Sequence, residues 1–187
     1  MTNYLVTGAT GLIGRHVVSL LLQRPDTGAV HALVREGSRD KFAAAARQWS
    51  HTEKLLPLLG DISATECGVA AEAIAELTGT IDHVVHLAAL YDITADDEAS
   101  TVANVEGTAH VLALAATLRA GCLQHVSSVA VAGDYHGTFT EDMFDAGQTL
   151  PTPYHRTKFE SERLVRSQHE VPWRVYRPAV VVGHSQT

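Results

Sequence analysis

Short runs of consecutive apolar residues alternate along the chain with segments in which apolar residues recur every three or four positions. The runs have the length of buried strands, and the spaced segments have the period of amphipathic helices. The pattern predicts strands at residues 3–7, 29–34, 54–59, 81–87, 123–128 and 173–182. It predicts helices at residues 12–23, 38–49, 66–77, 96–119 and 153–169.

Some details of these elements follow from single residues. In the first helix the pattern predicts one apolar face, made of Leu12, Ile13, Val17, Leu20 and Leu21. Pro57 predicts an irregular place in the sheet for the strand at 54–59. Gly121 is expected to end the helix at 96–119. The glycine-containing stretch 130–151 is predicted to be a functional loop.

Strand and helix alternate throughout, which is typical of an α/β fold. We expect a doubly wound, Rossmann-type parallel sheet with helices on both faces, joined by right-handed crossovers. No repeat or linker divides the chain, so residues 1–187 are predicted to form one dinucleotide-binding domain.

Composition and net charge limit the classes of partner that the chain is expected to bind. The chain has 187 residues, is 45% hydrophobic and carries a net charge of −7, which argues against nucleic acid or an anionic membrane as a partner. No apolar run approaches the roughly 20 residues that span a bilayer. Because only Cys67 and Cys122 occur and no signal peptide is visible, a cytoplasmic location is expected.

Eleven histidines raise the question of a metal. His83 and His86 lie three apart on a predicted strand and therefore point to opposite faces. The other histidines lack the spacing of a ligand set, so no metal site is predicted.

The stretch "VTGATGLIG" joins the first strand to the first helix. Gly8 permits the turn off the strand, Gly11 lets backbone amides approach a pyrophosphate, and Gly14 lets the helix pack closely. The helix N-terminus adds free N–H groups and a positive dipole end. A dinucleotide site is predicted here, although the three-residue glycine spacing differs from the commoner pattern.

The end of the second strand bears on the choice of dinucleotide. Arg35 stands where an acidic residue would bind the ribose of NAD, and a guanidinium there suits the 2′-phosphate of NADP. Ser38 and Arg39 are expected to add contacts. Glu36 keeps NAD open, because a shift of one residue would place a carboxylate at the site.

A second informative stretch is "YHRTK", in which Tyr154 and Lys158 share one helical face. The ammonium favours the phenolate, so the pair suits proton transfer near neutral pH. Ser127 and Ser128 end the fifth strand, at the carboxyl edge where open α/β sheets place their chemistry.

With these motifs in this order, the chain resembles the extended short-chain dehydrogenase/reductase family. The resemblance rests on "TGATGLIG", "GDI", "HLAA", "NVEGT", "VSSVAVAG", the Tyr154–Lys158 pair and "YRP". It implies catalytic roles for Ser128, Tyr154, Lys158 and Asn104. It implies that the cofactor contacts Gly8, Thr10, Gly11, Leu12, Ile13, Gly14, Arg35, Asp61, Ile62, Leu87, Ala88, Ala89, Tyr154, Lys158 and Pro178.

Within that family, "ALVREGS", "GDI" and "HLAALYDITAD" are similar to the fatty acyl-CoA reductase and thioester-reductase branch. The function expected is NADP-dependent reduction of a carbonyl or acyl thioester in a small-molecule substrate, with Tyr154 as acid/base. An NAD-dependent nucleotide-sugar epimerase and a non-catalytic NADP-sensing regulator remain alternatives.

Extended members place a smaller substrate domain after the segment that "RPAVVVG" resembles, and these 187 residues do not include one. We therefore expect a fragment that binds cofactor better than it turns over substrate. Members often pair long helices across a two-fold axis, so a homodimer through 96–119 and 153–169 is one interpretation. Packing within a single chain is the other.

Overall fold

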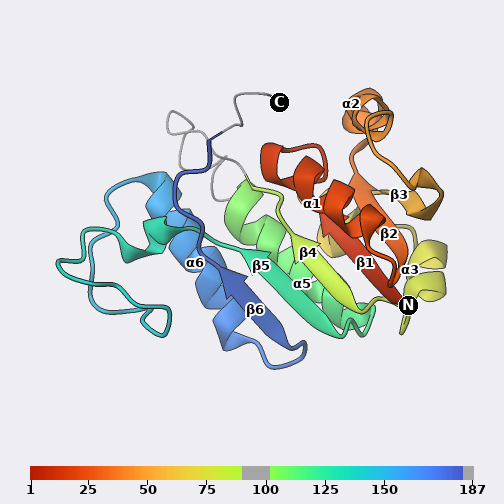
Figure 1. Ribbon diagram of the computed structural model, residues 1–187. Coiled ribbons are helices and arrows are strands. Elements are labelled where there is room, and N and C mark those ends of the chain that lie inside the picture. The colour runs from red at the N-terminus through yellow and green to blue at the C-terminus, as the bar shows by residue number, and fades with distance from the viewer. Residues whose placement is uncertain (90–101, 183–187) are drawn as a thin grey trace.

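Six parallel strands form one sheet in the computed structural model, which describes residues 1–89 and 102–182 (Figure 1). Their order is β3-β2-β1-β4-β5-β6. The predicted doubly wound parallel sheet is therefore confirmed. The strands are β1 (Thr2–Thr7), β2 (Thr27–Val34), β3 (Leu55–Leu59), β4 (His83–His86), β5 (Cys122–Val126) and β6 (Trp173–Tyr176).

Helices cover both faces of this sheet (Figure 1). The α-helices are α1 (Leu12–Gln23), α2 (Arg39–Ala46), α3 (Ala71–Leu77), α5 (Gly107–Thr117) and α6 (Pro153–Ser167). A π-helical turn, Val102–Glu106, leads directly into the helix α5. The segment 90–96 and the first part of the helix expected at 96–119 lie outside the described residues.

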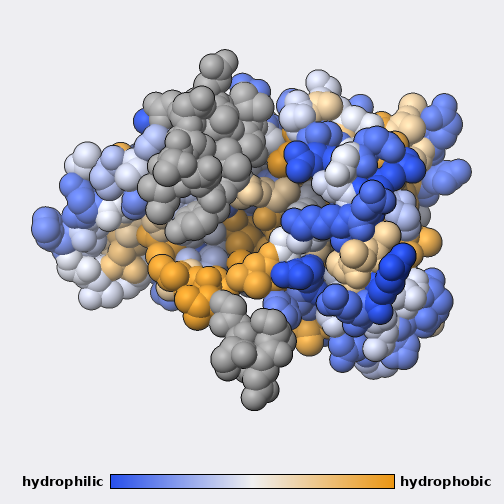
Figure 2. All heavy atoms as spheres, turned by 90° about the horizontal axis from the view of Figure 1, so that it is seen from above, coloured by the Kyte–Doolittle hydropathy of each residue, from blue (hydrophilic) through white to orange (hydrophobic). Residues whose placement is uncertain are grey.

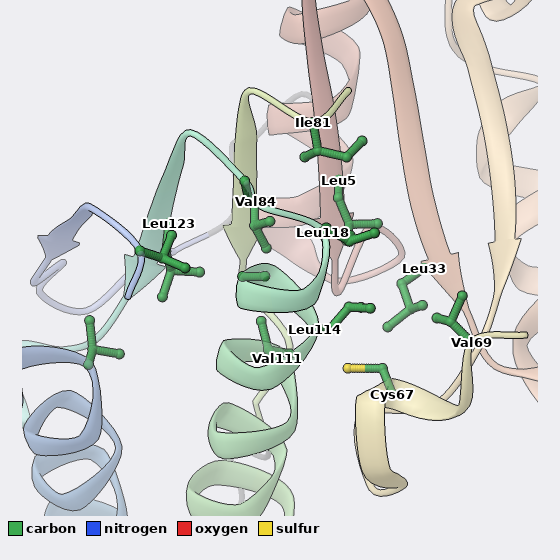
Figure 3. Close-up of a cluster of buried hydrophobic side chains, with 14 residues drawn as sticks. Leu5, Leu33, Cys67, Val69, Ile81, Val84, Val111, Leu114, Leu118 and Leu123 are labelled. Carbon is green, nitrogen blue, oxygen red and sulfur yellow. The ribbon is translucent and has the colours of Figure 1, made fainter. Parts of the chain in front are cut away.

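Each face of the sheet has its own buried core. On one face, Leu5, Val84 and Leu123 of three neighbouring strands pack against α5, as Figure 3 shows. On the other face, Val6 and Val30 pack against α1 and α2. Adjacent residues of β1 thus feed opposite cores, which is the alternation that a strand buried on both sides requires.

The expected apolar face of α1 is only partly correct, since Ile13, Val17 and Leu21 are partly buried. The buried residues are Gly14, Val18 and Leu22, while Leu20 is 64% exposed and Leu12 42% exposed. Gly14 has no side chain and lies against the backbone of Gly8, so this side of the helix comes closest to the sheet. The close approach rotates the flanking leucines away from the core.

Two other details differ from the pattern. The helix expected to end at Gly121 ends instead at Thr117, and Arg119 adopts a left-handed conformation with φ 52°. The helix expected at 66–77 is shorter and begins at Ala71, after a 3₁₀ turn. The irregularity expected at Pro57 is absent, because β3 pairs with β2 in regular register. The proline is tolerated there because β3 lies at the edge of the sheet.

The strand order reverses between β1 and β4, where the chain crosses from one edge of the sheet back to its centre. Open α/β sheets bind ligands at the carboxyl ends of the strands beside such a reversal. Figure 2 views the molecule from this end, and hydrophobic atoms gather there between two hydrophilic regions. In the described part of the chain, no helix is both long and apolar enough to span a bilayer.

Candidate functional site

The glycine turn lies at the reversal of strand order and is closed by its own backbone. Gly8 has φ +74°, and a Cβ there would lie 2.6 Å from the amide nitrogen of Ala88 on the far side of the reversal. A Cβ on Gly14 would overlap the carbonyl oxygen of Gly8. The N–H of Gly11 donates to that carbonyl at 3.0 Å, which completes the turn. A side chain at Gly8 or Gly14 would therefore collide with the backbone of Ala88 or of Gly8.

A cavity of about 390 Å³ opens at this turn. Of the residues expected to contact a cofactor, nine line it: Gly8, Thr10, Gly11, Arg35, Asp61, Ile62, Leu87, Ala88 and Ala89. Leu12, Ile13 and Gly14 do not line it, because α1 turns its buried side to the sheet. Thr7, Ala9 and Ser63 also line the cavity, and the sequence motifs did not identify them.

One end of the cavity is basic. Arg35, Ser38 and Lys41 all line it, and Lys41 was not identified from the sequence. The helical period could have indicated Lys41, because it follows Ser38 by three residues at the start of α2. Arg39, expected to contribute, does not line the cavity and pairs instead with Glu36 at 3.0 Å.

Asp61 closes another side of the same cavity. Its carboxylate accepts hydrogen bonds from the backbone N–H and the hydroxyl of Ser63, at 3.0 and 2.9 Å. These bonds hold the loop after β3 in place. The carbonyl of Ile62 accepts from the ring of His110 on α5 at 2.7 Å, which fixes the next residue of the loop.

The first turn of α6 carries Tyr154. Thr152 caps the helix by accepting a hydrogen bond from the N–H of His155, and Pro153 suits the first helical position because it needs no donor. Tyr154 therefore lies at the positive end of the helix dipole. Lys158 follows one turn later on the same face.

Lys158 is buried, with 6% of its surface exposed. Its ammonium donates to the carbonyl of Val126, at the end of β5, over 3.1 Å. Burial lowers the pKa of Lys158 to about 8, against the opposing influence of Glu162. A cation is thus held at the carboxyl end of the sheet, beside the helix turn that carries Tyr154.

Ser128 lies two residues after Val126 and is 9% exposed. Its side-chain oxygen accepts a hydrogen bond from the N–H of Ala130 at 3.1 Å. Because that bond uses the oxygen as an acceptor, the hydroxyl hydrogen stays available to donate. A donor at the end of β5 suits a carbonyl oxygen.

Asn104 lies in the π-helical turn and is 2% exposed. Its side-chain amide donates to the hydroxyl of Thr157, the residue before Lys158, at 3.1 Å. Asn104 is thereby joined to α6. π-helical turns inside helices frequently occur at functional sites.

A second cavity, of about 760 Å³, lies beyond β5 and β6. Its lining is mainly apolar and includes Val126, Val129 and Phe139. Ile13 and Pro178, both expected to contact the cofactor, line this cavity instead of the first.

A buried carboxylate helps to hold the loop 139–143, part of which lines the second cavity. Glu162 is fully buried and accepts from Arg177 at 2.6 Å and from Arg166 at 2.7 Å. Arg177 also donates to the carbonyl of Met143, at 2.8 Å, and so ties the loop to the exit of β6. Burial raises the pKa of Glu162, but hydrogen bonds from Arg177 and Arg166 outweigh it and leave the value lowered.

The histidines form no ligand set: in residues 1–89 and 102–182, no three His, Cys, Asp or Glu side chains gather as they would around a metal ion. His83 is partly exposed and stacks on Tyr4, while His86 is buried on the other face of β4.

The chain is similar to a known protein family and to several named proteins. Residues 6–187 match the model of the family described as Male sterility protein. The chain is 31% identical to glycine betaine reductase ATRR of Emericella nidulans, over 98% of this chain and 16% of that protein. It is 30% identical to the non-canonical nonribosomal peptide synthetase hkm10 of Aspergillus hancockii, over 97% of this chain and 20% of that protein.

Solved structures resemble this chain over nearly its whole length. The terminal R domain of the myxalamid PKS-NRPS pathway superposes with a TM-score of 0.86 and 29% identity, over 99% of this chain and 50% of that one. The dTDP-glucose 4,6-dehydratase DesIV of Streptomyces venezuelae, solved with NAD, gives 0.74 and 29%, over 94% and 55%. The chain thus spans about half of these solved relatives.

Proposed function

The chain belongs to the Male sterility protein family within the extended short-chain dehydrogenases/reductases, and on that premise we propose that it is the dinucleotide-binding and catalytic domain of an NADP-dependent reductase. The substrate class we propose is an acyl thioester or an aldehyde. Relatives whose names state an activity include a glycine betaine reductase and an aldehyde reductase of Aspergillus flavus.

The observation that carries this proposal is the buried ammonium of Lys158. Burying an ammonium to 6% exposure is unfavourable for folding, and such groups are common at functional sites. Here it lies one helical turn from Tyr154, at the end of β5, where Ser128 offers a hydroxyl. Tyr154 would supply a proton, Lys158 a charge that stabilises the phenolate, and Ser128 a hydrogen-bond donor to the substrate carbonyl.

The first cavity suits a dinucleotide phosphate. Gly8 and Gly14 leave no side chain in the turn, and the amides of the N-terminal turn of α1 face the carboxyl end of the sheet. Arg35, Ser38 and Lys41 would hold the 2′-phosphate that distinguishes NADP, because all three line this cavity and two of them are cations. Glu36, the alternative ribose ligand, is paired with Arg39.

Bound NADPH supplies a hydride; the protein supplies the groups around the carbonyl. Ser128 would donate to the carbonyl oxygen and polarise it, and Tyr154 would deliver a proton to that oxygen. Lys158 and the positive end of α6 stabilise the phenolate that remains. The apolar second cavity, held by the Arg177–Glu162 pair, would take the acyl group.

Titration with NADPH and NADH, followed by cofactor fluorescence, tests the cofactor assignment. We expect tighter binding of NADPH. Replacing Arg35 with Ala should weaken NADPH about 10- to 100-fold, the loss expected for hydrogen bonds between charged groups, and leave NADH almost unchanged. The Lys41→Ala variant should act in the same direction.

Arg39→Ala is the matched control, since Arg39 is an exposed arginine at the start of α2, four residues after Arg35, and does not line the cavity. It should bind NADPH like the unaltered chain. Equal affinity for the two cofactors, or an equal effect of Arg35→Ala and Arg39→Ala, would contradict NADP binding. It would favour Glu36 and an NAD-dependent epimerase.

The chemistry is tested separately with Tyr154→Phe, which removes one hydroxyl. Turnover of an acyl thioester or aldehyde should fall by about 100-fold or more, the usual contribution of a positioned acid. NADPH affinity should hardly change. The assay uses the full-length protein that contains these residues, and unchanged turnover in that protein would exclude Tyr154 as the acid.

A further inference from the structure

A buried polar side chain joins the two halves of the site, and the motifs did not assign it a role. His86 on β4 is 2% exposed. Its Nδ1 lies 2.8 Å from the hydroxyl of Thr7, the residue before Gly8. Its Nε2 lies 3.1 Å from the hydroxyl of Thr108 on α5.

The direction of the bond at Nε2 follows from the partner of Thr108. The Thr108 hydroxyl donates to the carbonyl oxygen of Asn104 at 2.6 Å, and a carbonyl only accepts. The single hydroxyl hydrogen is therefore used, so Thr108 must accept from His86. The hydrogen of the imidazole is then on Nε2.

The opposite side of the ring gives the same answer independently. The hydroxyl oxygen of Thr7 accepts from the amides of Leu87 and Ala88, at 3.3 and 3.2 Å. Its own hydrogen is left for Nδ1 of His86, which must be a bare acceptor. A second proton on the ring would bring a third donor to the same oxygen, so the bonding pattern requires a neutral imidazole.

The surroundings of the ring agree with this state. Burial, followed by the charges of His125 and Lys158, holds the pKa of His86 well below its usual range. The imidazole is therefore a fixed donor on one side and a fixed acceptor on the other.

The bonds on either side of His86 lead to both parts of the proposed site. Thr7, Leu87 and Ala88 line the first cavity. In the other direction, Asn104 donates to Thr157, which lies on α6 directly before Lys158. Hydrogen bonds, linked through the covalent structure of Asn104, thus connect the lining of the dinucleotide cavity to the helix that carries Tyr154.

We propose that His86 is a positioning residue, a neutral spacer with its hydrogen on Nε2 that sets the distance between the dinucleotide turn and the catalytic helix. The proposal rests on the proposed function for its catalytic part. Its structural part, the tautomer and the directed path, stands on the contacts alone.

His125 provides a matched control. It is the partner of His86 in the register of β4 and β5, their ring centroids are 5.4 Å apart, and it is 1% exposed. Within the described part of the chain, neither of its ring nitrogens has a hydrogen-bond partner. It shares the burial of His86 without its bonds.

The first experiment is nitrogen NMR of the cofactor-free chain, which distinguishes the two imidazole tautomers. We expect the Nε2–H form of His86 and no titration between about pH 6 and 8. An Nδ1–H form, or a proton taken up in that range, would overturn the proposal whatever the protein catalyses.

The second experiment breaks the path with little change in volume. In the full-length protein that contains these residues, Thr108→Val should lower kcat by about 10-fold or more, as expected for a small misplacement of catalytic groups, while NADPH affinity is kept. Thr108→Ser should restore kcat. His86→Leu should weaken both NADPH affinity and kcat, whereas His125→Leu should change neither.

The outcomes separate the two proposals. Normal kcat in Thr108→Val, or equal losses in His86→Leu and His125→Leu, would overturn the positioning role even if NADP-dependent turnover is confirmed. If no turnover is found, the NMR result and the NADPH affinity of His86→Leu against His125→Leu still decide the role of His86. Should His86→Leu fail to fold, Thr108→Val and its Ser rescue decide it.

Discussion

Gly14 lies where α1 meets the carbonyl of Gly8, and a single added carbon would overlap that oxygen. Gly37 is the opposite case, because a Cβ there meets nothing within 4 Å. The sequence motif assigned Gly14 to close helix packing. The structure shows that the neighbour is the backbone of the glycine turn itself, which cannot move aside as a side chain would.

We predict that Gly14→Ala destabilises the chain by about 1–3 kcal/mol, the usual cost of an added carbon in a packed site. It should also weaken NADPH binding, since the turn must shift. Gly37→Ala should be neutral or stabilise the chain by about 0.4–1 kcal/mol, because alanine lowers the conformational entropy of the unfolded state. Urea unfolding measures both, and equal effects would contradict the packing argument.

At the scale of elements, α5 ends at a position that the sequence pattern did not predict. The helix closes with the N–H of Ala120 bonded to Ala115 and the N–H of Arg119 bonded to Ala116, the arrangement of a Schellman motif. The left-handed residue in that motif is usually glycine, and here it is Arg119. Gly121, which the pattern favoured, packs against the backbone of Asp82 instead.

Arg119 is exposed, so replacing it with glycine loses little contact. We predict that Arg119→Gly stabilises the chain by about 1 kcal/mol, because a left-handed conformation is unfavourable for a residue with a Cβ. That corresponds to a Tm raised by about 2–4 °C for a chain of this size. Arg119→Ala should give no such gain, and an equal gain would assign the effect to the lost charge.

For the molecule as a whole, buried histidines set the response to acid: His86 and His125, with half-buried His31 acting in the same direction. Burial lowers the pKa of His125 to about 3 and that of His86 well below its usual range, with Lys158 adding to both. Below about pH 6.5 the unfolded chain takes up these protons and the folded chain does not, so stability falls as pH falls. The lowered pKa of Glu162 acts only below its ordinary value of 4.5, and that of Lys158 only above about 8.

We therefore predict that the free energy of unfolding falls between pH 6.5 and 5 by about 1.4 kcal/mol per pH unit for each of His86 and His125. His125→Leu should remove the share of one histidine from that slope in urea unfolding measured at several pH values. Exposed His169, replaced by Leu, should leave the slope unchanged. A slope insensitive to His125→Leu would mean that His125 is protonated in the folded chain.

The sequence by itself determined the parallel sheet, the glycine turn and the motif residues, because each is encoded in local periodicity or in a fixed spacing of a few residues. Arg35 was found the same way, at the end of its strand. The order of the strands in the sheet was not predicted and came from the structure.

Only the tertiary structure decided which face of α1 is buried, that Lys41 joins Arg35, and that Glu36 pairs with Arg39. It alone brought Thr7 to His86 across 79 positions and His86 to Thr108 across 22. No local pattern carries such information, because the chain distance between these residues is unrelated to their distance in space. The direction of a hydrogen bond depends on every partner that the fold assembles around it.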